Sequence, residues 1–308
     1  MRNIYDLTIK ELEDYFISIN EKKFRAVQVY EALYKRRIKS FDDMTNISKE
    51  VREKLKQDFS FYKIKMLIKQ QGKNVNKYLF ELEDGNKIES VLMFHDYGTS
   101  ICVSSQVGCN MTCAFCESGR LKKVRNLLAY EIVQQILQIE EDINKRITHV
   151  LLIWIGEPFD NYNNVLRFVK IINCGKGIDI GSRHITISTC GVIPGIKKFM
   201  NEEGQVNLAI SLHAPNNTLR SRIMPINKAY PLNELMETIK EYINKTNRRV
   251  TFEYIMLDNV NDSEENAKEL ALLLKGINCY VNLIPYNETE NIEFKRTKEW
   301  KIMKFYDI

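Results

Sequence analysis

Three cysteines, Cys109, Cys113 and Cys116, lie close together in the segment CNMTCAFC. Three residues and then two separate them, directly after a predicted strand, so that three thiolates can converge on one soft metal centre. A structural zinc site would need a fourth Cys or His at finger-like spacing, and none is obvious nearby. A 4Fe-4S cluster held by three cysteines instead leaves one iron open for a substrate or cofactor. The spacing therefore favours an iron-sulfur cluster over a zinc site or a chance grouping.

The remaining composition is that of a globular protein of the cytoplasm. The chain has 308 residues, of which 44% are hydrophobic and 28% charged. Its apolar run from Val150 to Ile155 is far shorter than the roughly 18 to 20 residues that cross a bilayer. The N-terminal residues lack the apolar core and cleavage site of a signal peptide. Seven cysteines, an odd number, favour metal binding or thiol chemistry over a disulfide framework in such a chain.

Basic residues gather in two segments of a chain whose formal charge is only +5. Such a charge does not by itself establish a nucleic-acid partner. The first segment is Lys22 to Lys39, and the second is Arg120 to Arg125, which follows the cysteines without an acidic residue. Both segments are compatible with solvated helix faces and equally with contacts to RNA phosphates.

The elements that must position the cysteines follow from hydrophobic periodicity. Residues 1–60 have helical spacing and predict a small N-terminal helical domain. Residues 61–98 have period-two stretches around the turn Asp84 to Asn86 and predict an antiparallel β connection. From residue 99 to 308, strands and helices alternate, which predicts right-handed βαβ units and an α/β fold with a parallel sheet. Ligands bind at the carboxyl ends of such strands. The predicted strands lie near 100–104, 148–155, 184–189, 205–212, 249–257 and 279–284, and the predicted helices near 129–145, 163–173, 194–202, 231–246 and 263–275.

The cysteine motif after the first strand of a βα array resembles the radical S-adenosylmethionine superfamily. Further ordered blocks resemble its RlmN/Cfr family of RNA methyltransferases, from about residue 4 to the end. The resemblance implies an open (β/α)6 partial TIM barrel behind the helical domain and the β connection. The blocks are Ser104 to Cys109, Gly156 to Pro158, Ser188 to Thr189, Ser211 to Asn216, Met224 to Asn227 and Asn282 to Asn287.

The resemblance implies methylation of an adenosine of 23S rRNA, position 2503, at C2 rather than C8, with tRNA as a further candidate substrate. It also implies a monomer that receives electrons from a flavodoxin or ferredoxin. Cys109, Cys113 and Cys116 would hold the 4Fe-4S cluster, and Gly156 and Glu157 would meet the amino group of S-adenosylmethionine. The remaining cofactor contacts would come from Ser188, Ser211, Leu212, His213 and Asn287.

Two further residues match catalytic positions of the family. Cys102 matches a thiol that releases the protein-bound adduct by forming a disulfide with a methyl-carrying cysteine near the C-terminus. Glu89 matches a proton acceptor. Without the resemblance, Cys102 is typical of a buried structural thiol and Glu89 of the solvent-facing side of an alternating strand.

The sequence departs from the family pattern in two places. It ends at Ile308 before any residue that matches the methyl-carrying cysteine, and Trp154 replaces the small residues that usually precede the Gly-Glu pair. We expect either a C-terminally shortened homologue that cleaves S-adenosylmethionine without methyl transfer, or radical chemistry with another thiol. A non-catalytic RNA-binding protein is a further alternative. Cys174, Cys190 and Cys279 are expected to be structural, although Cys190 follows Ser188 closely.

Overall fold

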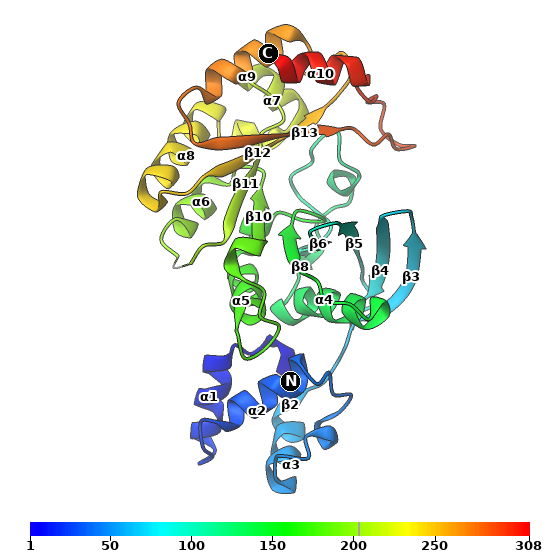
Figure 1. The fold of residues 1–308 in the computed structure, drawn as a ribbon, viewed down its shortest axis with the longest axis vertical. Coiled ribbons are helices and arrows are strands. Elements are labelled where there is room, and N and C mark those ends of the chain that lie inside the picture. Colours follow the sequence, from blue (N-terminus) through cyan, green and yellow to red (C-terminus); the bar gives the residue numbers. More distant parts are fainter. Residues whose placement is uncertain (203) are drawn as a thin grey trace. The chain divides into compact units, whose positions relative to one another are not determined.

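Parallel strands alternate with helices from residue 98 onward, in the succession that the sequence predicts (Figure 1). The computed structural model describes residues 1–202 and 204–308, and the chain divides into two units. Within the described ranges, no helix has both the length and the apolar character needed to cross a membrane. The first unit comprises Met1–Val107, Asn126–Trp154 and Asn161–Ile185, and the second comprises Gly108–Arg125, Ile155–Asp160 and Thr186–Ile308.

The sheet of the first unit joins an antiparallel meander to a parallel pair of strands. Its strand order is β9-β6-β5-β4-β3, in which only β6 and β9 are parallel. Buried and more exposed residues alternate along β4, as the period-two pattern predicts. The strands are β1 (Arg2–Asn3), β2 (Phe59–Ser60), β3 (Lys65–Gln71), β4 (Val75–Glu81), β5 (Lys87–His95), β6 (Gly98–Val103), β7 (Gln106–Val107) and β9 (His149–Leu152); β8 (Arg125–Asn126) and β10 (Ile185–Thr189) each span a boundary between the units.

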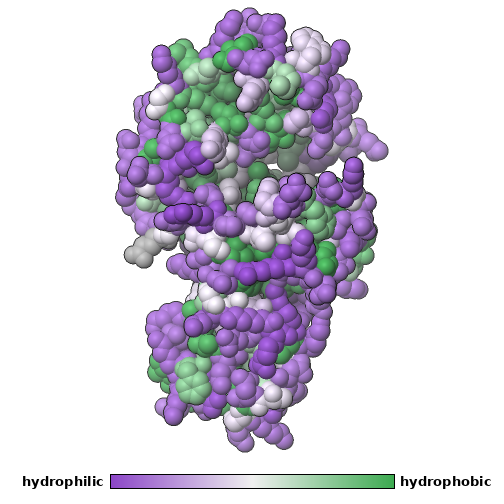
Figure 2. Space-filling view, in the orientation of Figure 1, coloured by the Kyte–Doolittle hydropathy of each residue, from purple (hydrophilic) through white to green (hydrophobic). Residues whose placement is uncertain are grey.

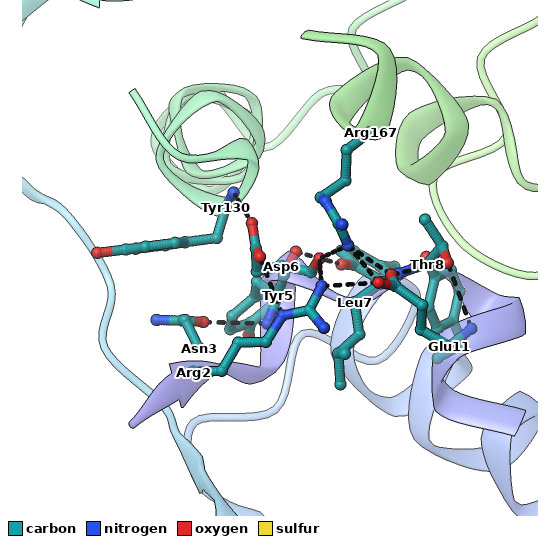
Figure 3. Close-up of polar contacts among 11 residues, drawn as sticks. Arg2, Asn3, Tyr5, Asp6, Leu7, Thr8, Glu11, Tyr130 and Arg167 are labelled. Carbon is teal, nitrogen blue, oxygen red and sulfur yellow. Dashed lines mark hydrogen bonds and ion pairs between the residues drawn. The ribbon is translucent and has the colours of Figure 1, made fainter. Parts of the chain in front are cut away.

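A network of charged side chains joins the first helix of the chain to the helix that follows β9. Thr8 and Glu11 form a capping box that starts the first helix. The Glu11 carboxylate also accepts hydrogen bonds from Arg167 at 2.6 Å and from Arg2 at 3.0 Å (Figure 3). Residues far apart in sequence are thereby joined around one carboxylate. The helices of this unit are α1 (Ile9–Ser18), α2 (Arg25–Tyr34), α3 (Lys49–Asp58), α4 (Ala129–Ile143) and α5 (Tyr162–Asn173).

The second unit contains a parallel sheet in the order β13-β12-β11-β10. Helices such as α6 and α8 lie beside these strands (Figure 1). Hydrophobic residues are gathered on the upper part of the surface in Figure 2, over elements of this unit. The elements are β11 (Asn207–Ser211), β12 (Val250–Met256), β13 (Cys279–Pro285), α6 (Ile193–Phe199), α7 (Asn217–Ile223), α8 (Leu232–Thr246), α9 (Glu264–Leu274) and α10 (Glu299–Asp307).

The structure corrects the sequence prediction at two places next to the candidate site. The strand expected over residues 148–155 ends at Leu152. Leu152 lies opposite Val103, the last residue of the neighbouring strand β6. Gly156 and Glu157 therefore lie in a loop rather than at a strand end. The helix α7 was not predicted; the Asn216 side chain caps it by accepting a hydrogen bond from the Leu219 N–H at 2.9 Å.

Candidate active site

The three cysteines lie in a loop that is closed by its own backbone. The Cys109 N–H donates to the Leu121 carbonyl at 3.0 Å, and the Cys116 N–H donates to the Cys113 carbonyl at 3.2 Å. The Ala114 N–H donates to the carbonyl of Ile223, the last residue of α7, at 2.9 Å. The loop is therefore held at both ends and in its middle, and the helix that the sequence analysis missed carries one of these anchors.

Glycine is required where the loop begins. Gly108 has φ +74°, a conformation that residues with a side chain rarely adopt. A Cβ at this position would also lie 2.2 Å from the Lys122 carbonyl oxygen. The close approach of the two ends of the loop thus depends on the absence of a side chain at Gly108.

The thiols of the cysteines are half-buried and influence one another. Burial raises the pKa of Cys109 to about 11 and the pKa of Cys113 to about 12. For Cys113, the next largest causes are the charges of Cys116 and Cys109. A cationic metal centre would favour the thiolate forms, which burial disfavours in its absence.

An aromatic contact connects the cysteine loop to the end of β11. The ring of Phe115, between Cys113 and Cys116, meets the His213 ring edge-on with centroids 5.0 Å apart. The His213 Nδ1 accepts a hydrogen bond from the Ile255 N–H at 3.1 Å. Burial, followed by the nearby Arg220 charge, lowers the pKa of His213 to about 3. His213 is thus a neutral imidazole whose hydrogen is on Nε2.

Glu157 is a buried carboxylate held by backbone donors. One oxygen accepts a hydrogen bond from the Phe159 N–H at 2.9 Å, and the other accepts one from the Cys190 N–H at 2.8 Å. Burial raises the pKa of Glu157, although these hydrogen bonds oppose the shift. Gly156, before it, has φ +105°. The Gly-Glu pair therefore joins the loop after β9 to the end of β10.

The strand ends of the second unit carry the other predicted cofactor residues. Ser188 on β10 is buried, and its Oγ has no hydrogen-bond partner among residues 1–202 and 204–308. The N–H groups of Leu212 and His213 donate to the Glu253 carbonyl at 3.0 and 3.2 Å, so these two residues are fixed to β12. Asn287 lies exposed, two residues after β13.

Comparisons with known proteins agree with this arrangement. The model of the ribosomal RNA large subunit methyltransferase N-terminal domain matches residues 2–60, and that of the radical SAM superfamily matches residues 103–271. A protein of Spiroplasma citri, described as a probable dual-specificity RNA methyltransferase RlmN, is 52% identical over all of this chain and 90% of its own length. A protein of the same description from Enterococcus faecalis is 52% identical over 99% of this chain and 88% of its own length.

This chain belongs to the RlmN family. A crystal structure of a radical SAM methyltransferase from Sphaerobacter thermophilus superimposes with a TM-score of 0.94 at 39% identity, covering 100% of this chain and 92% of that one. The predicted radical SAM fold is thus confirmed. Like other RlmN-family members, the chain is a radical SAM RNA methyltransferase.

The cysteine loop fits the 4Fe-4S cluster that the RlmN family implies. In the described part of the chain, no three His, Cys, Asp or Glu residues form a site for a single metal ion. A four-iron cluster does not need such a site, because each thiolate binds a different iron. Three thiols in one loop are a suitable soft donor set, and the buried Ser188 hydroxyl, without a partner among the described residues, suits a polar group of a cofactor.

Glu89 and Cys102 belong to the first unit, whereas the cysteine loop belongs to the second. Glu89, on β5, forms an ion pair with Lys77 on the neighbouring strand β4 at 2.7 Å. Cys102 is buried on β6, opposite Val91 of β5 and Leu151 of β9. Their proposed catalytic roles remain predictions.

Sequence reasoning missed Arg220 of α7, whose side chain is completely buried. It was not distinguished from Arg222, which is exposed on the same helix. A sequence signal existed in the short segment between the blocks Ser211 to Asn216 and Met224 to Asn227, both of which resemble the family. A charged residue between two such blocks is a candidate for contact with them.

Proposed function

We propose that this RlmN-family member methylates C2 of an adenosine of 23S rRNA, with S-adenosylmethionine bound at a 4Fe-4S cluster. One observation supports the site above all: the cysteine loop is hydrogen-bonded to α7, while its Phe115 packs on His213 at the end of β11. The metal ligands and the predicted cofactor residues thus belong to one connected structure. When bound, the cluster supplies the electron that cleaves S-adenosylmethionine.

The chain's own residues would bind and orient the cofactor. Cys109, Cys113 and Cys116 would hold the cluster. The Glu157 carboxylate, which two backbone N–H groups already orient, would attract the cationic amino group of S-adenosylmethionine, together with Gly156. The buried Ser188 hydroxyl would find its missing partner in a polar group of the cofactor. Backbone and side-chain groups of Ser211, Leu212, His213 and Asn287 would complete the binding site.

Cys102 and Glu89 would act on the RNA-bound intermediate. By the family resemblance, Cys102 would form a disulfide with a methyl-carrying cysteine, for which residues 1–308 contain no match, while the bond from that sulfur to the adduct carbon breaks. Glu89 would accept the ring proton. Lys77 keeps Glu89 paired in this structure, so a proton acceptor role requires the carboxylate to leave or share that ion pair.

The RNA interface is proposed for residues 1–60 and for the segment Arg120 to Arg125. Several of these cations already have protein partners: Arg37 pairs with Glu140, and Lys39 pairs with Glu141. Binding of RNA phosphates would have to compete with these ion pairs. The dual-specificity description of the relatives supports a second RNA substrate, for which we propose tRNA. A monomer and a flavodoxin or ferredoxin as electron donor complete the proposal.

The test is anaerobic incubation of the reconstituted protein with unmodified 23S rRNA, S-adenosylmethionine and a reductant, followed by mass spectrometry of the adenosines. We expect 2-methyladenosine, lost in Cys109→Ala and retained in Cys279→Ala, a thiol on β13 outside the cysteine loop. A product methylated at C8 would overturn the C2 assignment. Formation of 5′-deoxyadenosine without any methylated adenosine would overturn the methylation proposal while supporting the cluster.

A further inference from the structure

Arg220 carries a positive charge that is completely buried in the second unit and bonded only to neutral oxygens. Its guanidinium donates to the carbonyls of Cys190 at 2.7 Å, Ser211 at 3.1 Å and Leu212 at 3.2 Å, and to the Asn227 Oδ1 at 2.9 Å. Within the part of the chain that the structure describes, no carboxylate forms an ion pair with it. The hydrogen bonds are satisfied, but the charge is not neutralised.

An unpaired buried charge is costly and is retained only where an anion compensates it. Burial accordingly lowers the pKa of Arg220, to about 10, and the charges that oppose this shift are those of Cys190 and Cys113. Cys113, a proposed cluster ligand, packs against the buried group of side chains that includes Cys190 and Ile223. The anion that compensates Arg220 would therefore be the cluster with its thiolate ligands.

The position of Arg220 connects it to every part of the proposed site. Two of its carbonyl partners are Cys190, directly after β10, and Ser211, the last residue of β11. The Cys190 N–H in turn donates a hydrogen bond to the Glu157 carboxylate. The last residue of its own helix, Ile223, accepts the hydrogen bond from Ala114 in the cysteine loop. Gly191 leaves space for it, since a Cβ there would lie 3.3 Å from an Arg220 nitrogen. The guanidinium is thus fixed beside the cysteine loop by three separate segments.

We propose that Arg220 is the positioning residue that supplies the fixed countercharge of the three-cysteine site and raises the reduction potential of its cluster. This inference rests on the proposed function, because it requires that the cysteines hold a 4Fe-4S cluster. A reduced cluster carries one more negative charge than an oxidised one, so a fixed cation nearby stabilises the reduced state. Arg220 would thereby make the electron needed for S-adenosylmethionine cleavage easier to deliver to the cluster.

Two substitutions remove the net charge in different ways. Arg220→Gln removes the cation, whereas Asn227→Asp keeps it and places a carboxylate on the atom that now accepts its hydrogen bond at 2.9 Å. Arg220→Lys retains the charge, and Arg222→Gln removes an exposed charge from the same helix as a matched control. Circular dichroism of each reconstituted variant checks folding, and iron and sulfide analysis checks cluster content.

The measurement is a redox titration of the reconstituted proteins, followed by electron paramagnetic resonance without S-adenosylmethionine. For Arg220→Gln and Asn227→Asp we expect about a tenfold lower ratio of reduced to oxidised cluster at a given potential, equivalent to about 59 mV for one electron. Arg220→Lys and Arg222→Gln should titrate like the wild type.

The redox titration distinguishes failure of the Arg220 proposal from failure of the proposed cluster. Wild-type potentials in folded, fully loaded Arg220→Gln or Asn227→Asp protein would overturn the countercharge role and leave the proposed cluster intact. If Arg220→Gln does not fold, Asn227→Asp alone gives the answer, since it leaves the guanidinium in place. Failure of the wild-type protein to take up iron and sulfide would overturn the proposed cofactor, and with it this inference.

Discussion

The backbone N–H of Cys190 donates a hydrogen bond of 2.8 Å to the Glu157 carboxylate, and so joins two loops that are 33 residues apart in sequence. The same carboxylate accepts a hydrogen bond from the Phe159 N–H at 2.9 Å. Burial raises the pKa of Glu157, and the hydrogen bonds from the backbone oppose this shift. Glu157 therefore has both a structural task in the second unit and a proposed task in cofactor binding.

Replacement of Glu157 by Gln should weaken both tasks. An amide has one acceptor oxygen and one donor nitrogen, so that one of the two N–H groups, from Phe159 or Cys190, loses its acceptor. We expect a loss of about 1–3 kcal/mol in the free energy of unfolding, together with weaker S-adenosylmethionine binding. Urea unfolding and calorimetric titration measure the two effects.

Cys190→Ala is the matched variant for Glu157→Gln, because it keeps the backbone donor and removes only the thiol. We expect cluster content and S-adenosylmethionine affinity close to those of the wild type. Loss of methyl transfer in Cys190→Ala, with the cluster and binding intact, would instead assign the thiol a chemical role and contradict its structural interpretation.

The order of the longer strands and helices could be predicted because they have a clear period in the sequence, whereas the short helix α7 was missed. The end of β9 could not be predicted, since the apolar run continues to Ile155 while the strand ends at Leu152. The strand ends level with its neighbour β6, whose last residue, Val103, lies opposite Leu152. Strand ends of this kind depend on a neighbour that a local pattern does not reveal.

The residues proposed to bind the cluster were predicted from their types and spacing. The residues that hold these ligands in place were not predicted. Cysteine spacing identifies Cys109, Cys113 and Cys116 without any tertiary information. Arg220 is different, because Arg222 is also an arginine and lies only two residues away. Only the packing of α7 buries the side chain of Arg220 and leaves that of Arg222 exposed. The support of a site comes from contacts between distant segments, which one sequence does not show.

Gly108→Ala should disrupt the cysteine loop more than its backbone conformation alone explains. The added Cβ would meet the Lys122 carbonyl at 2.2 Å, so the two ends of the loop must separate. We expect reduced cluster uptake, measured as iron per protein after reconstitution. Gly85→Ala is the control, because its φ of +79° is close to the +74° of Gly108 but nothing lies within 4 Å of its Cβ. Equal cluster uptake by the two variants would show that the close contact has no effect.

Removal of the cluster should loosen the cysteine loop locally. A group that binds only the folded state stabilises the segment that holds it, so that segment loses this stabilisation when the group is removed. We expect faster hydrogen exchange over residues 108–125 after chelation of the iron under anaerobic, reducing conditions. The hairpin of β4 and β5, in the first unit, is the internal reference. Unchanged exchange of the loop would contradict its role as the cluster site.

The ion pair of Glu11 with Arg167 should make part of the stability depend on pH. Burial alone would raise the pKa of Glu11, but hydrogen bonds from Arg167, Thr8 and Arg2 outweigh it and lower the pKa from 4.5 to about 2. A carboxyl group whose pKa is lowered in the folded state stabilises the protein fully above its unfolded pKa and loses this contribution as the pH falls towards the folded pKa.

We therefore expect Arg167→Met to lower the free energy of unfolding by about 1 kcal/mol at pH 7, a value reduced by the partial exposure of the pair. The difference from the wild type should shrink as the pH falls from 4.5 towards 2, because the protonated Glu11 no longer attracts Arg167. Urea unfolding at pH 7, 4.5 and 3.5 measures it. Lys10→Met, which breaks an exposed pair with Asp14 on the same helix, should leave the unfolding midpoint unchanged. A difference that stays constant over this pH range would show that Arg167 contributes through packing rather than through its charge.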